Sequence, residues 1–259
     1  MVVGLSQLLV IVAVLAAWQW LPLWHSLSAH LSFLNPAVIS SPRRVAVQFW
    51  NLLSGDNSTA TIWPFLAKTL EATGIALVCG IIAGVVMGLV FSGSRYVDSV
   101  FQPFLYSLNA IPIVAMIPVL DIICGPNLTL TSVTGAIIVF FMTFFNAREG
   151  ARTIAPETVQ NTTLLGAGKV QVVLRVRLPY VVAWTFTALP NAISFGLLGV
   201  VTAEFLSGVQ GIGYELTLSL ANANPTNTIS VAILLAVISL LLVGLSRTIR
   251  SRVLHWWDA

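Results

Sequence analysis

Residues 148–179 read REGARTIAPETVQNTTLLGAGKVQVVLRVRLP and form the only long polar interval between two strongly apolar blocks. Pro156 suits the first position of a helix, where its missing N–H costs nothing. About three helical turns should follow, since Gly166 can adopt the left-handed conformation that ends a helix and Gly168 can open the next one. Pro179 is expected to set a boundary where the following apolar block begins, because proline cannot continue the helical hydrogen-bond ladder. The stretch therefore predicts two short helices joined by a glycine turn, an arrangement suited to docking.

The composition predicts that this polar interval lies at the surface of a membrane domain. The chain has 259 residues, of which 57% are hydrophobic and 8% are charged. A soluble domain carries about 25% charged residues, so this chain lacks the side chains for a water-facing surface and must lie in lipid. Its net charge of +3 fits a bias of basic residues toward cytoplasmic loops, and nucleic acid is not an expected partner. Cys79 and Cys124 fall in separate apolar blocks, so neither a disulfide nor a metal site is predicted.

Six apolar segments are each near the roughly 20 residues that cross a bilayer. They lie at about 5–23, 69–91, 103–124, 130–146, 180–204 and 228–245. An amphipathic stretch at 43–53 predicts a short helix in the membrane interface. The sequence thus predicts an all-α integral membrane protein, with an N-terminal anchor helix and external loop at 1–66 and a core of five further spans at 67–259.

Two patterns within the spans predict how they pack. Gly80, Gly84 and Gly88 are spaced four apart and line one side of a helix, which allows a second helix to approach closely in lipid. This stripe predicts a helix–helix seam. The third span contains Pro112 and Pro118, and each proline leaves a carbonyl that a neighbouring helix must satisfy. That span is therefore expected inside the bundle.

The distribution of lysine and arginine predicts the orientation of the chain. If 148–179 is cytoplasmic, nine basic residues lie inside and three outside, in agreement with the positive-inside rule. The inside set is Arg95, Arg148, Arg152, Lys169, Arg175, Arg177, Arg247, Arg250 and Arg252, and the outside set is Arg43, Arg44 and Lys68. Both termini are then predicted to be cytoplasmic. A loop over 208–225, rich in glycine and asparagine, is expected to join the last two spans outside.

Several short motifs resemble one family of membrane proteins. One motif resembles half of the cytoplasmic loop of permease subunits of binding-protein-dependent ABC importers. It consists of Gly166, nine further residues, Val176, one residue and then Leu178-Pro179. Three further segments extend the resemblance over roughly residue 69 to the end, and the nitrate/sulfonate/taurine branch is the most similar. These are Ala110-Ile111-Pro112 with Pro118, Val201-Thr202-Ala203-Glu204 with Gly211-Ile212-Gly213-Tyr214, and the arginine- and tryptophan-containing segment 247–257.

The resemblance implies a fold, partners and a set of contact residues. It implies a MetI-like type I importer permease without catalytic activity or a cofactor of its own, paired with a second, identical copy in the lipid bilayer of a bacterial inner membrane. Two cytoplasmic ABC ATPase subunits would bind Mg-ATP, and an external binding protein would deliver a small polar solute such as nitrate, a sulfonate, taurine or a related organic nutrient. A cytoplasmic coupling helix would enter a groove in the ATPase. The implied coupling residues are Pro156, Glu157, Gln160, Asn161, Thr162, Thr163, Leu164, Leu165, Gly166, Ala167, Gly168, Leu178 and Pro179.

One departure from the family pattern affects this docking prediction. The family usually has Glu-Ala-Ala where this chain has Gln160-Asn161-Thr162. Small apolar residues would let the helix lie close to its partner, whereas Asn and Thr are bulkier and polar. Docking is therefore expected to use added hydrogen bonds or a divergent ATPase.

Polar residues and prolines near the apolar blocks are candidates for the translocation path or its gate. They are Asn109, Pro112, Pro118, Asp121, Asn191, Ser194 and Glu204. Glu204 could form an ion-paired external latch or contact the binding protein, or its carboxylate could simply reach headgroup water. Asp121 could line the path and disfavour anions, or lie at the outer interface beside Gly125. The amides and Ser194 could instead only bond neighbouring helices.

Two other functional classes would require features that this sequence largely lacks. A six-span secondary transporter or channel would work without an ATPase and would be expected to carry charges near mid-span, which are scarce here. An intramembrane enzyme would need acid, base or metal-binding residues facing a cavity. The sequence has no nucleophile–base arrangement, no nucleotide-binding Gly-Lys motif and no metal-ligand cluster, so catalysis is not predicted.

Overall fold

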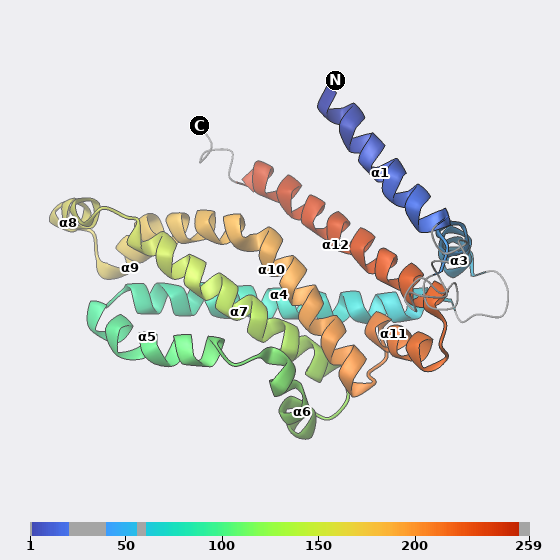
Figure 1. The fold of residues 1–259 in the computed structure, drawn as a ribbon. Coiled ribbons are helices and arrows are strands. Elements are labelled where there is room, and N and C mark those ends of the chain that lie inside the picture. Colours follow the sequence, from blue (N-terminus) through green and yellow to red (C-terminus); the bar gives the residue numbers. More distant parts are fainter. Residues whose placement is uncertain (1, 21–39, 56–60, 254–259) are drawn as a thin grey trace.

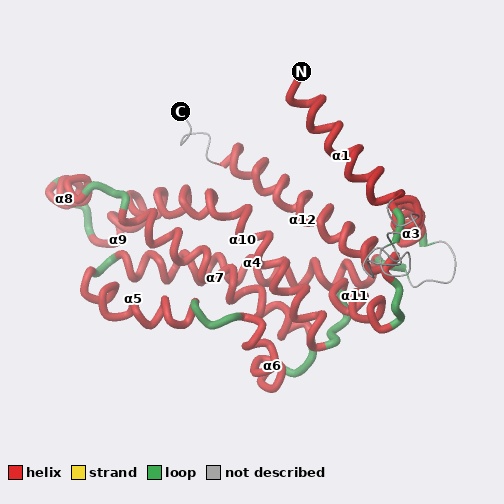
Figure 2. The backbone as a smooth tube through the Cα atoms, in the orientation of Figure 1, coloured by secondary structure: helices red, strands yellow, loops and turns green. Residues whose placement is uncertain are grey.

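The computed structural model describes residues 2–20, 40–55 and 61–253, and these residues are helical with no strand among them. The helices are α1 (Val2–Trp20), α3 (Pro42–Ser54), α4 (Trp63–Ser92), α5 (Arg95–Asn109), α6 (Ile113–Cys124), α7 (Leu128–Arg152), α8 (Pro156–Leu164), α9 (Lys169–Val172), α10 (Leu178–Ser207), α11 (Ile212–Ala221) and α12 (Pro225–Val253). A π-helical segment, Val173–Arg177, joins α9 to α10. Short loops connect most of these elements (Figure 2).

The long helices run between two ends of the molecule. Figure 1 shows α8 at one end and α3 and α11 at the other. Four helical stretches are long and apolar enough to cross a membrane: α4, α7, the run from Lys169 to Ser207, and α12. The bent pair α5 and α6 counts as a fifth when taken as one span. The first predicted span corresponds to α1 as far as Trp20, and its last residues lie outside the described part of the chain.

The glycine stripe is confirmed as a seam between α4 and α7. A Cβ atom added to Gly80 would lie 2.6 Å from the Cβ of Val139, and one added to Gly84 would lie 2.7 Å from the Cβ of Thr143. Real carbon atoms do not approach so closely, so only glycine allows this helix separation. On its other side α7 packs on α10, which places α7 in the middle of the bundle.

The third predicted span, at about 103–124, is not one straight helix. Helices α5 and α6 meet at an angle of 90°, and the break lies at 110–112. Pro112 has extended backbone angles (φ −60°, ψ 120°) and precedes the first residue of α6. Its ring disfavours a helical conformation at the preceding residue, and it has no N–H to continue the ladder. Pro118, by contrast, lies within α6 and does not interrupt it.

The expected burial of this span is also not found within one chain. Ile117 is the only buried residue of α6, whereas Ile122 is 87% exposed and Ile123 is 72% exposed. Pro112 therefore marks a bend at the surface of the single chain, and α6, which contains Pro118, is not enclosed by its neighbours within this chain.

The polar interval folds largely as expected, with two differences. Helix α8 begins at Pro156, Gly166 has a φ of +89°, and Gly168 precedes α9. The first five residues of the interval belong to α7, however, which continues to Arg152.

The second difference is that Pro179 does not break the helix. The helix runs through it from α9 into α10, and the N–H of Leu178 donates to the carbonyl of Val173, five residues back. A π-helical turn of this kind accommodates residues that would disturb an α-helical ladder.

At the opposite end, two short helices close the bundle. The predicted interfacial helix is α3, which packs on α12: Ser230 Oγ donates to the carbonyl of Val45 over 3.2 Å, and Gln48 Nε2 donates to Asn227 Oδ1 over 3.1 Å. The segment expected to be a loop at 208–225 instead contains α11. The loop prediction rested on glycine and asparagine residues, but Gly211 and Gly213 are required for close packing against Glu204 rather than for chain reversal.

Candidate coupling and translocation sites

The surface of α8 carries two apolar side chains that the chain itself does not cover. Leu164 is 85% exposed and Leu165 is 89% exposed. The hydroxyls of Thr162 and Thr163 donate to carbonyls within α8, at 2.6 and 2.8 Å, so they are satisfied by their own helix. Gln160 is also exposed. A protruding helix tip with uncovered leucines is a surface suited to contact with a partner protein.

Most other predicted coupling residues are also accessible on the surface of the chain. Pro156, Glu157 and Asn161 are exposed, and Thr162 is half-buried. Gly166 turns the chain beyond Leu165, and a Cβ added there would meet nothing within 4 Å. Ala167 is half-buried and Gly168 exposed, while Leu178 and Pro179 form the first turn of α10. The predicted coupling residues thus lie together on one projection and at its base.

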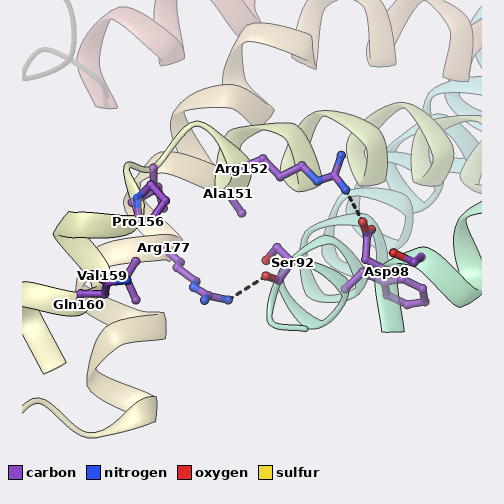
Figure 3. Close-up of a pocket in the computed structure, with 11 residues that line it drawn as sticks. Ser92, Asp98, Ala151, Arg152, Pro156, Val159, Gln160 and Arg177 are labelled. Atoms are coloured by element: carbon purple, nitrogen blue, oxygen red, sulfur yellow. Dashed lines mark hydrogen bonds and ion pairs between the residues drawn. The ribbon is translucent and has the colours of Figure 1, made fainter. Parts of the chain in front are cut away.

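Polar contacts hold the base of this projection against the rest of the bundle. Ile154, just before α8, is buried. Arg177 Nη1 donates to the carbonyl of Ser92 at the end of α4, over 3.0 Å. Figure 3 shows this contact and the neighbouring pair of Arg152 with Asp98. The Arg177 contact therefore attaches the base of the projection to α4, and the Arg152–Asp98 pair joins the end of α7, which precedes α8, to α5.

Asp98 is the central acceptor of this attachment, and the sequence reasoning missed it. Asp98 and Arg148 are both buried, each with 5% of the residue surface exposed. Arg148 Nη2 donates to Asp98 Oδ2 over 2.8 Å, Arg148 Nε donates to Oδ1, and Arg152 also binds the carboxylate. Two basic residues four apart on one face of α7 are the sequence signal that could have predicted an acidic partner.

A cavity of about 550 Å³ lies at the break between α5 and α6. It is lined by Leu108, Asn109, Ala110, Ile111, Pro112, Ile113, Met116, Ile137, Ile138, Phe141, Met142, Phe195 and Leu198. Two predicted path residues, Asn109 and Pro112, are therefore brought together. The lining has one amide side chain and no charged one, so it is suited to passage of a solute rather than to tight capture of an ion.

The remaining path candidates lie outside this cavity. Asn191 is exposed on the α10 face that carries Phe195 and Leu198, at helical spacing from both. Ser194 donates to the carbonyl of Pro190 over 3.1 Å, so it bonds its own helix. Asp121 is half-buried, and its Oδ1 has no hydrogen-bond partner in the described part of the chain.

Glu204 has neither environment that was expected for it. It is 1% exposed, so it reaches neither headgroup water nor an external protein in this structure, and no Lys or Arg of the described chain lies within ion-pair distance. Its Oε1 accepts from Thr69 Oγ1 over 2.8 Å, and its Oε2 accepts from the N–H of Gly213 over 2.9 Å. A role in gating stays a prediction.

Through these contacts Glu204 and Thr69, which belong to other helices, cap the N-terminal end of α11. Thr69 Oγ1 also accepts from the N–H of Ile212 over 2.9 Å, so residues of α4 and α10 satisfy two N–H groups at the start of α11. Such N–H groups have no partner within their own helix. A Cβ on Gly211 would lie 2.1 Å from the carboxyl carbon of Glu204, which explains why glycine is needed there.

Sequence comparison places the chain among named transport proteins. A family model described as "binding-protein-dependent transport system inner membrane component" matches residues 80–255. The riboflavin transport system permease protein of Chloroflexus aurantiacus is 26% identical over 188 residues, which cover 73% of this chain and 67% of that protein. The taurine transport system permease protein of Escherichia coli is 23% identical over 187 residues, covering 72% and 68%. The nitrate import permease protein of Leptolyngbya laminosa is 25% identical over 222 residues, covering 82% and 78%.

A solved structure has the same overall fold. The inward-facing MetNI methionine ABC transporter contains a chain that matches with a TM-score of 0.60 and 18% identity, covering 80% of this chain and 97% of that one. At this identity the likeness concerns the fold alone.

Proposed function

Because this chain belongs to the family of binding-protein-dependent transport system inner membrane components, we propose that α8 couples it to a separate ATPase and that the α5–α6 cavity forms part of its translocation path. The chain is a permease subunit of an ATP-binding cassette importer, from the branch that includes nitrate, taurine and sulfonate permeases. It is non-catalytic, and ATP hydrolysis belongs to a separate subunit. This assignment favours an importer over a channel or secondary transporter.

The uncovered leucines of α8 are the observation that carries the coupling proposal. Leu164 and Leu165 would enter an apolar groove of the ATPase, as amphipathic helices do in groove-bound complexes. From α8 the chain passes through one turn into the helical run that ends at Ser207. A force on α8 would therefore reach α10, whose side chains Phe195 and Leu198 line the cavity.

The cargo and the partners follow from the same arrangement. The cargo is a small polar solute delivered by an external binding protein, and the mainly apolar lining would pass it on without holding it. A second, identical copy would cover the exposed face of α6, which presents Ile122 and Ile123.

The membrane is a bacterial inner membrane, with α8 and both termini on the cytoplasmic side. The basic residues near α8 support that orientation.

Replacing Leu165 with Asp tests the coupling proposal. The full importer is expressed with tagged permease, and the ATPase that co-purifies and the uptake of substrate are both measured. Because Leu165 is 89% exposed, the variant should fold normally, whereas a charge in an apolar groove should weaken assembly by roughly tenfold or more.

The matched control is Leu220→Asp, which places the same change on a leucine that is 55% exposed at the end of α11, opposite α8. This variant should retain the ATPase. Normal assembly and ATP-dependent uptake by Leu165→Asp would refute the proposed coupling contact.

A further inference from the structure

A second cavity, of about 580 Å³, lies where α8 meets the bundle. Its walls come from the end of α4, the start of α5, the end of α7, α8 and the π-helical segment (Figure 3). The polar groups that line it are Ser92, Asp98, Ser99, Arg152, Gln160 and Arg177. Phe91, Ile154 and Val159 form apolar parts of the wall.

The charges around this cavity do not balance. Asp98 is the only carboxylate in the lining, and it already accepts from Arg148 and Arg152. Arg177 adds a third guanidinium group, so three positive groups meet one negative group. The excess of positive charge attracts an anion.

Arg177 has donors to spare in this position. It is half-buried, and its one hydrogen bond in the described chain is from Nη1 to the carbonyl of Ser92. A guanidinium group carries five N–H donors in a planar fork, which matches the oxygens of a phosphate group. Ser92 and Gln160 line the same space and can contribute further polar contacts.

We propose that this cavity binds the phosphate group of an anionic phospholipid headgroup, with Arg177 and Arg152 as its principal contacts. The volume far exceeds that of a phosphate ion and accommodates a headgroup with its glycerol. Basic pockets between membrane helices on the cytoplasmic side are known to bind the headgroups of cardiolipin and phosphoinositides.

The surroundings favour a lipid over a soluble phosphate. The adjoining surfaces of α4 and α5 expose apolar side chains, with Val90 57% exposed, Tyr96 78% and Phe101 49%. Acyl chains would lie along these side chains while the headgroup enters the cavity. Because Pro156 and Gln160 form one wall, a bound headgroup would also brace α8 against α4 and α5.

The test compares Arg177→Gln with Arg175→Gln in the purified, delipidated full chain. Arg175 is exposed and does not line the cavity, so it is a matched control two residues away. Binding of phosphatidylglycerol is titrated and counted by native mass spectrometry, with phosphatidylcholine as the zwitterionic comparison. Wild type and Arg175→Gln should bind phosphatidylglycerol alike, and Arg177→Gln should bind it roughly tenfold more weakly.

Two further arms identify the source of the phosphate and exclude misfolding. Inorganic phosphate is added as a competitor: no displacement at millimolar concentration supports a lipid, and full displacement supports the phosphate site but assigns it to a soluble anion. Thermal unfolding in lipid-free detergent should remain cooperative for both variants, with Arg177→Gln somewhat less stable because it loses the hydrogen bond to the Ser92 carbonyl. Equal lipid binding by Arg177→Gln and wild type overturns the proposal.

Discussion

Replacing Gly84 with Ala should separate α4 from α7 and destabilise the bundle. An added Cβ would lie 2.7 Å from the Cβ of Thr143 and 2.9 Å from the backbone nitrogen of Phe144. Backbone atoms cannot rotate away, so the helices must move apart by roughly 1 Å to restore ordinary carbon contacts of about 3.5–4.0 Å. Overpacking of this kind typically costs about 1–3 kcal/mol.

Gly74→Ala is the matched control, because it lies on the same helix. A Cβ added to Gly74 meets nothing within 4 Å. Alanine is favoured over glycine in a helix by about 1 kcal/mol, and this gain is common to both variants. The difference in unfolding free energy between the two variants therefore isolates the overlap and should be about 1–3 kcal/mol, with Gly84→Ala the less stable.

The assay is reversible unfolding of the purified chain in detergent, followed by near-UV circular dichroism. Gly84→Ala should unfold at lower denaturant concentration than wild type, and Gly74→Ala at the same or higher concentration. Equal stability of the two variants would refute the tight α4–α7 seam.

Two further substitutions test the buried polar contacts. Asp98→Ala leaves Arg148 buried without its carboxylate and should lower the free energy of unfolding by about 3–5 kcal/mol in the same assay. The control Glu149→Ala changes an exposed residue and should alter that free energy by less than about 0.5 kcal/mol. Similar values for the two variants would show that the ion pair is not needed. Thr69→Val removes the hydroxyl that accepts from the N–H of Ile212 and donates to Glu204, and it should lower the free energy of unfolding by about 1–3 kcal/mol. The control Thr73→Val removes a hydroxyl that donates only to the carbonyl of Thr69 and should be nearly neutral. The reverse order of stability would contradict the capping of α11 by Thr69 and Glu204.

Local patterns were sufficient for much of the architecture. Composition predicted a lipid-embedded helical protein, and Pro156, Gly166 and Gly168 predicted the start of α8 and the turn after it. The spacing of Gly80, Gly84 and Gly88 predicted a seam without naming the partner helix. These features depend on neighbouring residues or on helical periodicity, which the sequence contains directly.

Other features depended on which distant segments meet. Asp98 and Arg148 are 50 residues apart, and Glu204 and Thr69 are 135 residues apart, so no local pattern pairs them. Helix α11 likewise could not be predicted from local patterns, because residues of α4 and α10 satisfy its first N–H groups.

The sequence by itself determined that this chain lies in a membrane and carries a projecting helix, because hydrophobicity and helix-ending residues act locally. Only the tertiary structure decided that the prolines at 112 and 118 act differently, that Glu204 is buried, and that Arg177 faces a cavity. The physical reason is that burial, charge pairing and the direction of a bend are set by contacts among helices far apart in the chain.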